Sequence, residues 1–327
     1  MVPAHPLKLP FDRQVAAWRQ NFPRALLGGV EPLHQSRVAT RRLREILPVC
    51  SAGEPLAAAK KARRQVRLFG RTMGKMRELD VTTTIIGKFE ETRPAAVEHL
   101  RYYLRDARSA ERARLLARLD GRKAASFERV LDEISERLRA PRAPEAWRKA
   151  LAARLVQRTR RLREAVAAAG ALYVPDRVHA VRISLKKLRY ALELARDTGV
   201  RGLPGRLAQL KTVQETLGRL IDLETAQRYV RAATLAGKPD APWVAGLERL
   251  RLDLERTCRQ LHGRFVPQRL LVLGVCDVAR QAASRIVRPH GARRRGGALK
   301  MSWVARAPLA RGPRPARRAD WGRRTAP

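Results

Sequence analysis

Apolar residues recur every three or four positions along almost the whole chain. Stretches rich in Ala, Leu, Arg and Glu, such as residues 100–119 and 244–265, show this spacing most clearly. It is the period of an amphipathic helix, whereas the strict alternation typical of a half-buried strand is not evident anywhere. The pattern therefore predicts an all-α fold.

Clusters of Pro and Gly interrupt this pattern. They fall at residues 27–32, 48–55, 139–146, 170–176, 198–205 and 235–242. Because Pro and Gly disfavour a continuing helix, helices are expected to end at these places. The cluster at 139–146 lies near the middle and predicts a joint between two similar halves, residues 10–140 and 145–287. Residues 288–327 are rich in Arg, Gly, Pro and Ala, a composition typical of a disordered tail.

One segment of the pattern occurs twice. "LHQSRVATRRLR" begins at Leu33 and "VHAVRISLKKLR" begins at Val178. Each copy has a histidine, a cation three residues later, a cation pair four residues after that, then Leu and Arg. About 30 residues beyond each copy comes a second matched pair, residues 73–80 and 217–224. Two local matches kept in register indicate that a whole helical unit is duplicated.

The repeated segment has one cationic face. At 100° per residue its histidine and most of its cations lie opposite the apolar residues, while Arg42 and Lys187 flank this cationic face. The candidate ligand-binding residues of the two copies are His34, Arg37, Arg41, Arg42 and Arg44, and His179, Arg182, Lys186, Lys187 and Arg189. A run of charge is usually a solvated helix face, but its repetition favours a binding role.

The helix expected after the first copy carries a further row of cations. Its members, spaced three or four residues apart, are Lys60, Arg64, Arg67, Arg71 and Lys75. A row of like charges destabilises a helix by a few tenths of a kcal/mol per pair unless something neutralises it. The second half has only Lys211 and Arg219 at these places, interrupted by Glu215, so the two halves need not bind equally.

The amino-acid composition indicates the charge of the binding partner. Lys and Arg total 70 against 30 Asp and Glu, a formal net charge of +40, which favours a polyanionic partner. Cys50, Cys258 and Cys276 are too widely spaced to suggest disulfides or a zinc site, so we expect a reducing cytoplasm. No run is long and apolar enough for a membrane span or a secretory signal, and no bound metal or cofactor is expected.

Some residues of the repeated segments have structural roles as alternatives to ligand binding. His34 and His179 either contact an anion or brace the start of their helix, and these roles are compatible. In residues 73–80 we expect Gly74 to permit close helix packing. Glu78 and Asp80 are expected to brace the motif arginines.

These repeated segments resemble the CHAD family, the conserved histidine α-helical domain, over residues 10–287. The resemblance implies two pseudo-symmetric four-helix bundles whose basic helices line a shared groove. It also implies binding of inorganic polyphosphate without known catalysis, and association with polyphosphate granules. The Glu-x-Glu-x-Lys strand of the triphosphate-tunnel domain that many relatives carry is missing, so we expect a stand-alone member.

The sequence is compatible with three functions. Non-enzymatic polyphosphate binding leads, because many Lys and Arg contacts along a chain of phosphates add up. General nucleic-acid binding fits the net charge and the tail, although aromatics make up only 5% of the chain and few of them are placed to stack bases. An enzyme with His34 or His179 as phosphoryl acceptor or base is disfavoured, since no carboxylate cluster suited to magnesium accompanies either histidine.

Overall fold

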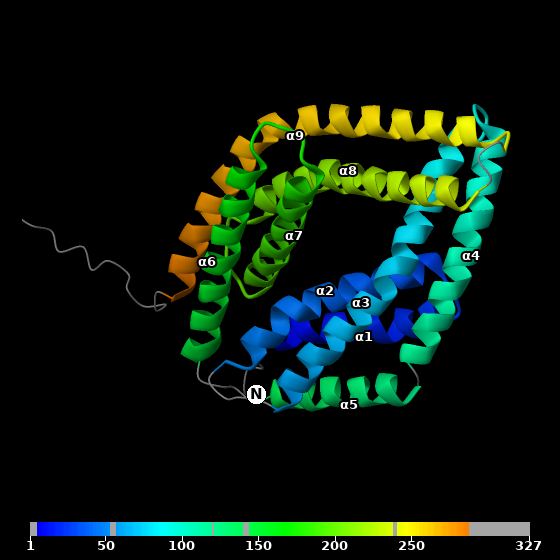
Figure 1. The fold of residues 1–327 in the computed structure, drawn as a ribbon. Helices are drawn as coiled ribbons and strands as arrows, with labels where there is room; N and C mark the ends of the chain where they lie inside the picture. The colour runs from blue at the N-terminus through cyan, green and yellow to red at the C-terminus, as the bar shows by residue number, and fades with distance from the viewer. Residues whose placement is uncertain (1–4, 53–56, 120, 140–143, 238–240, 288–327) are drawn as a thin grey trace, which may run out of the picture. The chain divides into compact units, whose positions relative to one another are not determined.

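Helices account for the secondary structure of the described residues, as the apolar spacing predicts. The computed structural model describes residues 5–52, 57–119, 121–139, 144–237 and 241–287. These form α1 (Lys8–Leu26), α2 (Val30–Cys50), α3 (Ala57–Ile86), a 3₁₀ turn (Gly87–Phe89), α4 (Pro94–Arg118), α5 (Gly121–Arg137), α6 (Pro144–Ala169), α7 (Pro175–Asp197), α8 (Pro204–Ala236) and α9 (Val244–Val287) (Figure 1). The all-α prediction is confirmed. The predicted tail, residues 288–327, lies outside the described residues.

The breaks between helices follow the Pro and Gly clusters. α7 and α8 both begin with Pro in the first turn, where a missing N–H costs nothing. Between them Gly199 and Gly202 have φ angles of 98° and 80°, which residues with a Cβ rarely adopt. Two further breaks, around the 3₁₀ turn after α3 and between α4 and α5, lack such a cluster and were not predicted.

Aromatic side chains of α1, α3 and α5 form one cluster in the core. Trp18 and Phe22 of α1 stack at a centroid distance of 4.1 Å, and Phe69 of α3 meets Trp18 edge-on at 4.8 Å. Phe127 of α5 stacks on Phe69 at 5.0 Å. All four are buried, so this cluster fixes α3 and α5 against α1.

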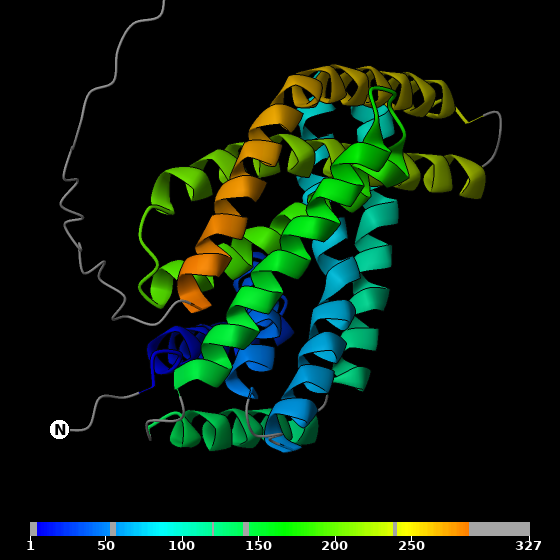
Figure 2. The same ribbon diagram turned by 90° about the vertical axis from the view of Figure 1, so that its left-hand side faces the viewer.

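The two copies of the repeat meet in space. α2 packs against α7 and α3 against α8, while α6 contacts α2, α7 and α9. Figure 2 shows α6 and α9 side by side across the second half. α9 contains Pro267 and changes direction along its length (Figure 1), as expected where a helix loses a hydrogen bond to Pro. Division into two four-helix bundles remains a prediction; α1–α5 precede the expected joint and α6–α9 follow it.

Candidate functional site: a cationic cavity between the repeated helices

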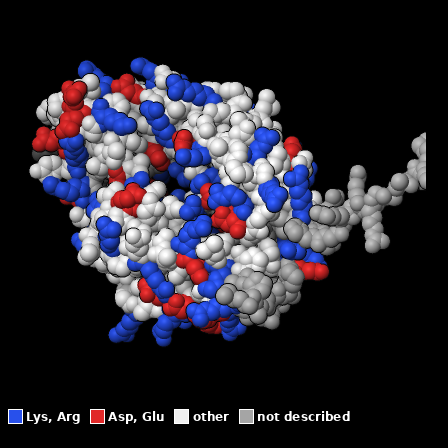
Figure 3. Space-filling model, turned by 180° about the vertical axis from the view of Figure 1, so that it is seen from behind, with Lys and Arg blue, Asp and Glu red and all other residues white. Residues whose placement is uncertain are grey.

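A cavity of about 1140 Å³ lies where the repeated helices meet. Side chains of α2, α3, α6, α7 and α8 line it. Its cations are Arg37, Arg41, Arg44, Arg63, Arg67, Arg77, Arg154, Arg158, Arg161, Arg182, Lys186, Lys187 and Arg228. Its carboxylates are Glu45, Glu78, Asp176, Asp222 and Glu224. Figure 3 shows Lys and Arg gathered around a hollow on the face seen there. The cavity therefore carries a large excess of positive charge.

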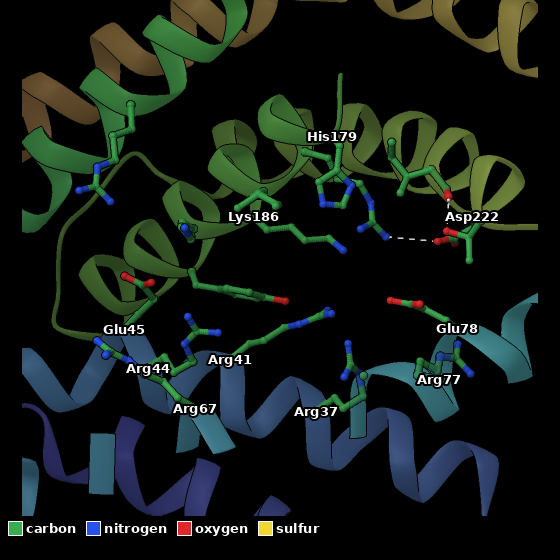
Figure 4. Close-up of a pocket in the computed structure, with 18 of the residues that line it drawn as sticks. Arg37, Arg41, Arg44, Glu45, Arg67, Arg77, Glu78, His179, Lys186 and Asp222 are labelled. Carbon is green, nitrogen blue, oxygen red and sulfur yellow. Dashed lines mark hydrogen bonds and ion pairs between the residues drawn. The ribbon is translucent and has the colours of Figure 1, made fainter. Parts of the chain in front are cut away.

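Most of the motif residues face this cavity, and Figure 4 shows members of the two copies opposite one another. From the predicted site the structure brings together His34, Arg37, Arg41, Arg44, Arg67, His179, Arg182, Lys186 and Lys187. The two copies of the repeated sequence therefore line one shared cavity, which helices from both parts of the chain form.

Two motif arginines do not line the cavity. Arg42 donates to Glu193 at 3.2 Å, and Arg189 donates to the same carboxylate at 2.5 Å and to Gln214 at 2.8 Å. Glu193 therefore joins an arginine of α2 to one of α7 at a helix–helix contact. Helix packing turns Arg42 and Arg189 toward this carboxylate and away from the cavity lining, and their contact with a ligand stays a prediction.

The row of cations on α3 also lies mostly elsewhere. Only Arg67 of that row lines the cavity. Lys60, Arg64 and Arg71 are exposed, and Lys75 lies 3.9 Å from Glu111. Lys211 and Arg219 of α8 are likewise exposed and outside the lining. The face of α3 that lines the cavity is rotated about the helix axis from the face that carries this row. Gly74 and Arg77 lie on the cavity face.

Sequence reasoning missed six cations of the lining. They are Arg63, Arg77, Arg154, Arg158, Arg161 and Arg228. The three from α6 are spaced four and three residues apart and thus share one helix face, a signal present in the sequence but outside the repeat.

Arg37 and Arg182 occupy equivalent places in the two copies. Arg37 donates to the carbonyl of Gly70 at 2.9 Å and passes close to Gly74, where a Cβ would come within 3.2 Å of its guanidinium. Arg182 donates to Asp222 at 3.4 Å, and its buried Nε has no hydrogen-bond partner among the described residues. Burial lowers the pKa of both arginines, that of Arg37 to about 10. The structure thus holds desolvated guanidinium groups at the cavity wall.

The expected roles of the downstream segments are partly corrected. Asp80 pairs with Arg108 of α4 at 2.7 Å rather than with a motif arginine, whereas Asp222 of the second segment does brace Arg182. Glu78 lines the cavity without an ion pair among the described residues. Gly74 makes room for the Arg37 side chain, not for a close helix backbone.

Burial and cationic neighbours favour uncharged side chains within the site. The pKa of Lys186 is lowered to about 6. Burial contributes most, followed by the positive charges of Arg182 and Arg41, whereas the negative charge of Asp222 raises the pKa. The pKa of His34 is lowered by burial and Arg77, and that of His179 by burial and Arg182. These groups can accept protons when negative charge enters the cavity.

Neither a cluster of metal-binding side chains nor a membrane-spanning helix is found among the described residues. In the described part of the chain no three His, Cys, Asp or Glu side chains are placed to hold a metal ion together. The helices that the structure describes include none that is long and apolar enough to span a membrane.

Fold and site together define an all-α protein with an internal cationic cavity. The chain belongs to the CHAD family, since the CHAD domain model matches residues 11–231. The crystal structure of the CHAD domain from the plant Ricinus communis is similar, with a TM-score of 0.55, 22% identity, and coverage of 86% of this chain and 92% of that one. PptA from Streptomyces chartreusis is also similar, with a TM-score of 0.53 and 19% sequence identity. The match covers 86% of this chain and 100% of PptA. No curated protein matches the chain.

Proposed function

We propose that the protein binds inorganic polyphosphate in this cavity without acting on it chemically. The observation that carries the proposal is the convergence of both motif copies on one cavity in which cations far outnumber carboxylates. Placing so many like charges together is costly unless a polyanion neutralises them. Membership of the CHAD family agrees with this ligand.

A linear polyphosphate suits this arrangement better than duplex DNA. The cations lie inside a cavity, which a thin and flexible chain of phosphates can enter. A duplex is a wide cylinder whose phosphates lie on its outside, so it can meet only the exposed cations. We therefore propose nucleic-acid binding as a weaker activity of exposed Lys and Arg, and polyphosphate granules as the place where the protein accumulates in cells.

A pair of charge-matched double variants tests the proposal. Arg41→Gln with Arg182→Gln removes two cations of the cavity, whereas Arg64→Gln with Arg71→Gln removes two exposed cations of α3 outside it. Calorimetry with long-chain polyphosphate is expected to show a loss of at least about tenfold for the first variant, because charge-assisted contacts between guanidinium and phosphate are strong. The second variant is expected to change affinity by less than about threefold.

The reverse ranking, with both variants folded by circular dichroism, would place the ligand on the outer face of α3. Competition with duplex DNA completes the test: polyphosphate is expected to displace DNA, and preference for DNA would favour the nucleic-acid alternative.

A further inference from the structure

Lys186 lines the cationic cavity, and no ion pair joins it to a carboxylate of the described residues. It extends from α7 into the cavity, between His179 and Arg41 in the view of Figure 4. No carboxylate of the described residues lies within ion-pair distance of its amine. Arg182 on its own helix and Arg37 and Arg41 on α2 surround it with positive charge, while Asp222 on α8 is already engaged by Arg182.

These surroundings favour the neutral amine over the ammonium. An ammonium would repel three guanidinium groups, which cannot give up their protons at neutral pH, so lysine is the member of the cluster that loses one. The lowered pKa of Lys186, about 6 through burial and then Arg182 and Arg41, agrees with this geometry. A neutral amine is nucleophilic, whereas an ordinary exposed lysine with a pKa of about 10.4 is almost entirely protonated.

The same arginines can hold the phosphate of a small reagent next to that amine. Guanidinium groups bind phosphate with paired hydrogen bonds, and a phosphate held by Arg41 and Arg182 would bring its substituent close to Lys186. Lys187 also lines the cavity but faces a different set of charges, namely Arg158 and Arg44 with Glu45 opposing. The pKa of Lys187 is lowered too, but Arg41 and Arg182 act on Lys186, so a phosphate that these two arginines hold places its electrophile nearer to Lys186.

We propose that Lys186 is a site of acylation by acyl phosphates bound in the cationic cavity. The Lys186 nitrogen attacks the carbonyl carbon and a C–N bond forms. The C–O bond to phosphate breaks, and its electron pair leaves with the phosphate. The nitrogen loses a proton to the departing phosphate or to water. The products are an amide at Lys186 and inorganic phosphate, and no other reactant is required.

Acylation alters the polyanion site. An amide cannot take up a proton, and it adds bulk within the cavity. This consequence rests on the proposed function: acylated protein is expected to bind polyphosphate at least about tenfold more weakly, comparable with the loss of one charge-assisted contact. The labelling itself does not depend on polyphosphate.

The test is acetylation of the full chain by acetyl phosphate at pH 7.5, with the rate at each lysine followed by mass spectrometry. Lys149 and Lys211 are internal controls, since their side chains are 67% and 70% exposed and lie outside the cavity. Lys186 is expected to react at least about tenfold faster than either, because its amine is neutral. Inorganic phosphate is expected to slow Lys186 alone.

Acetic anhydride, which carries no phosphate, is the control reagent and is expected to show a smaller preference for Lys186. Equal rates at Lys186, Lys149 and Lys211 would overturn the proposal, and so would a preference that phosphate does not reduce. Polyphosphate binding is measured separately on unmodified protein. Its absence there would refute the proposed function and leave the acylation result to stand on its own.

Discussion

Arg158 of α6 donates two hydrogen bonds to the carboxylate of Glu45 in α2, at N···O distances of 3.0 and 3.2 Å. Both side chains are buried, and Arg154 donates to the same carboxylate at 2.6 Å. Glu45 thus fastens α6, which precedes the second motif copy, to the helix of the first copy. It also holds two arginines of the cavity wall in place.

Glu45→Gln is expected to lower the free energy of unfolding by about 3 kcal/mol, because it leaves two arginines without their buried counter-charge. Urea unfolding measures the change. Glu145→Gln is the control, since its pair with Lys149 is exposed and worth less than about 1 kcal/mol. A similar loss in both variants would show that the Glu45 network has no special stabilising role.

Polyphosphate affinity is expected to fall as pH rises from about 6 to 8. The pKa of Lys186 is lowered to about 6 in the empty cavity, and a bound polyanion raises it. Between these two values the complex holds a proton that the ligand-free protein lacks, so binding takes up a proton and weakens with rising pH, by up to about tenfold per pH unit for each proton. His34 and His179, whose pKa values are also lowered by burial, act in the same direction.

Calorimetry at several pH values, in buffers of different ionisation enthalpy, measures this proton uptake. Lys186→Arg is the matched variant, since it keeps a cation that does not titrate, and its affinity is expected to vary less with pH. An unchanged slope in Lys186→Arg would assign the linkage to other groups.

Neighbouring arginines of one motif are expected to differ in their effect on binding. Arg41 lines the cavity, whereas Arg42 is engaged by Glu193. Arg41→Gln is therefore expected to weaken polyphosphate binding by at least about tenfold and Arg42→Gln by less than about threefold. Titration of both variants with polyphosphate at one salt concentration measures these two affinities. Equal losses of affinity would mean that the ligand extends beyond the cavity to Arg42.

Removal of residues 288–327 is expected to preserve polyphosphate binding and to reduce DNA binding. This segment is rich in Arg and lacks the helical spacing of the motifs, so its attraction to phosphates is expected to be unspecific and strongly salt-dependent. Gel-shift titrations with both ligands test this. A truncated protein that loses both activities equally would make the tail part of the polyphosphate site.

The all-α class, most of the helix breaks and the family could be predicted from the sequence alone. Apolar spacing is local information, and Pro and Gly act on the backbone within a residue or two, so six of the breaks could be predicted. The two that were missed, near residues 87–93 and 119–120, have no Pro and Gly cluster of this kind. The repeated motif gave the cationic faces of α2 and α7, because a helix face follows directly from residue spacing.

Only the tertiary structure decided which cations act together. Arg42 and Arg67 both look like site residues on a helical wheel, but α7 presents Glu193 to the first and the cavity receives the second. Arg154 and Arg158 join the site because α6 packs against α2, more than a hundred residues earlier in the chain. The proton affinity of Lys186 likewise depends on burial and on Arg41 across the cavity. Electrostatic effects act through space, so they follow the packing of distant helices and cannot be deduced from the spacing within one.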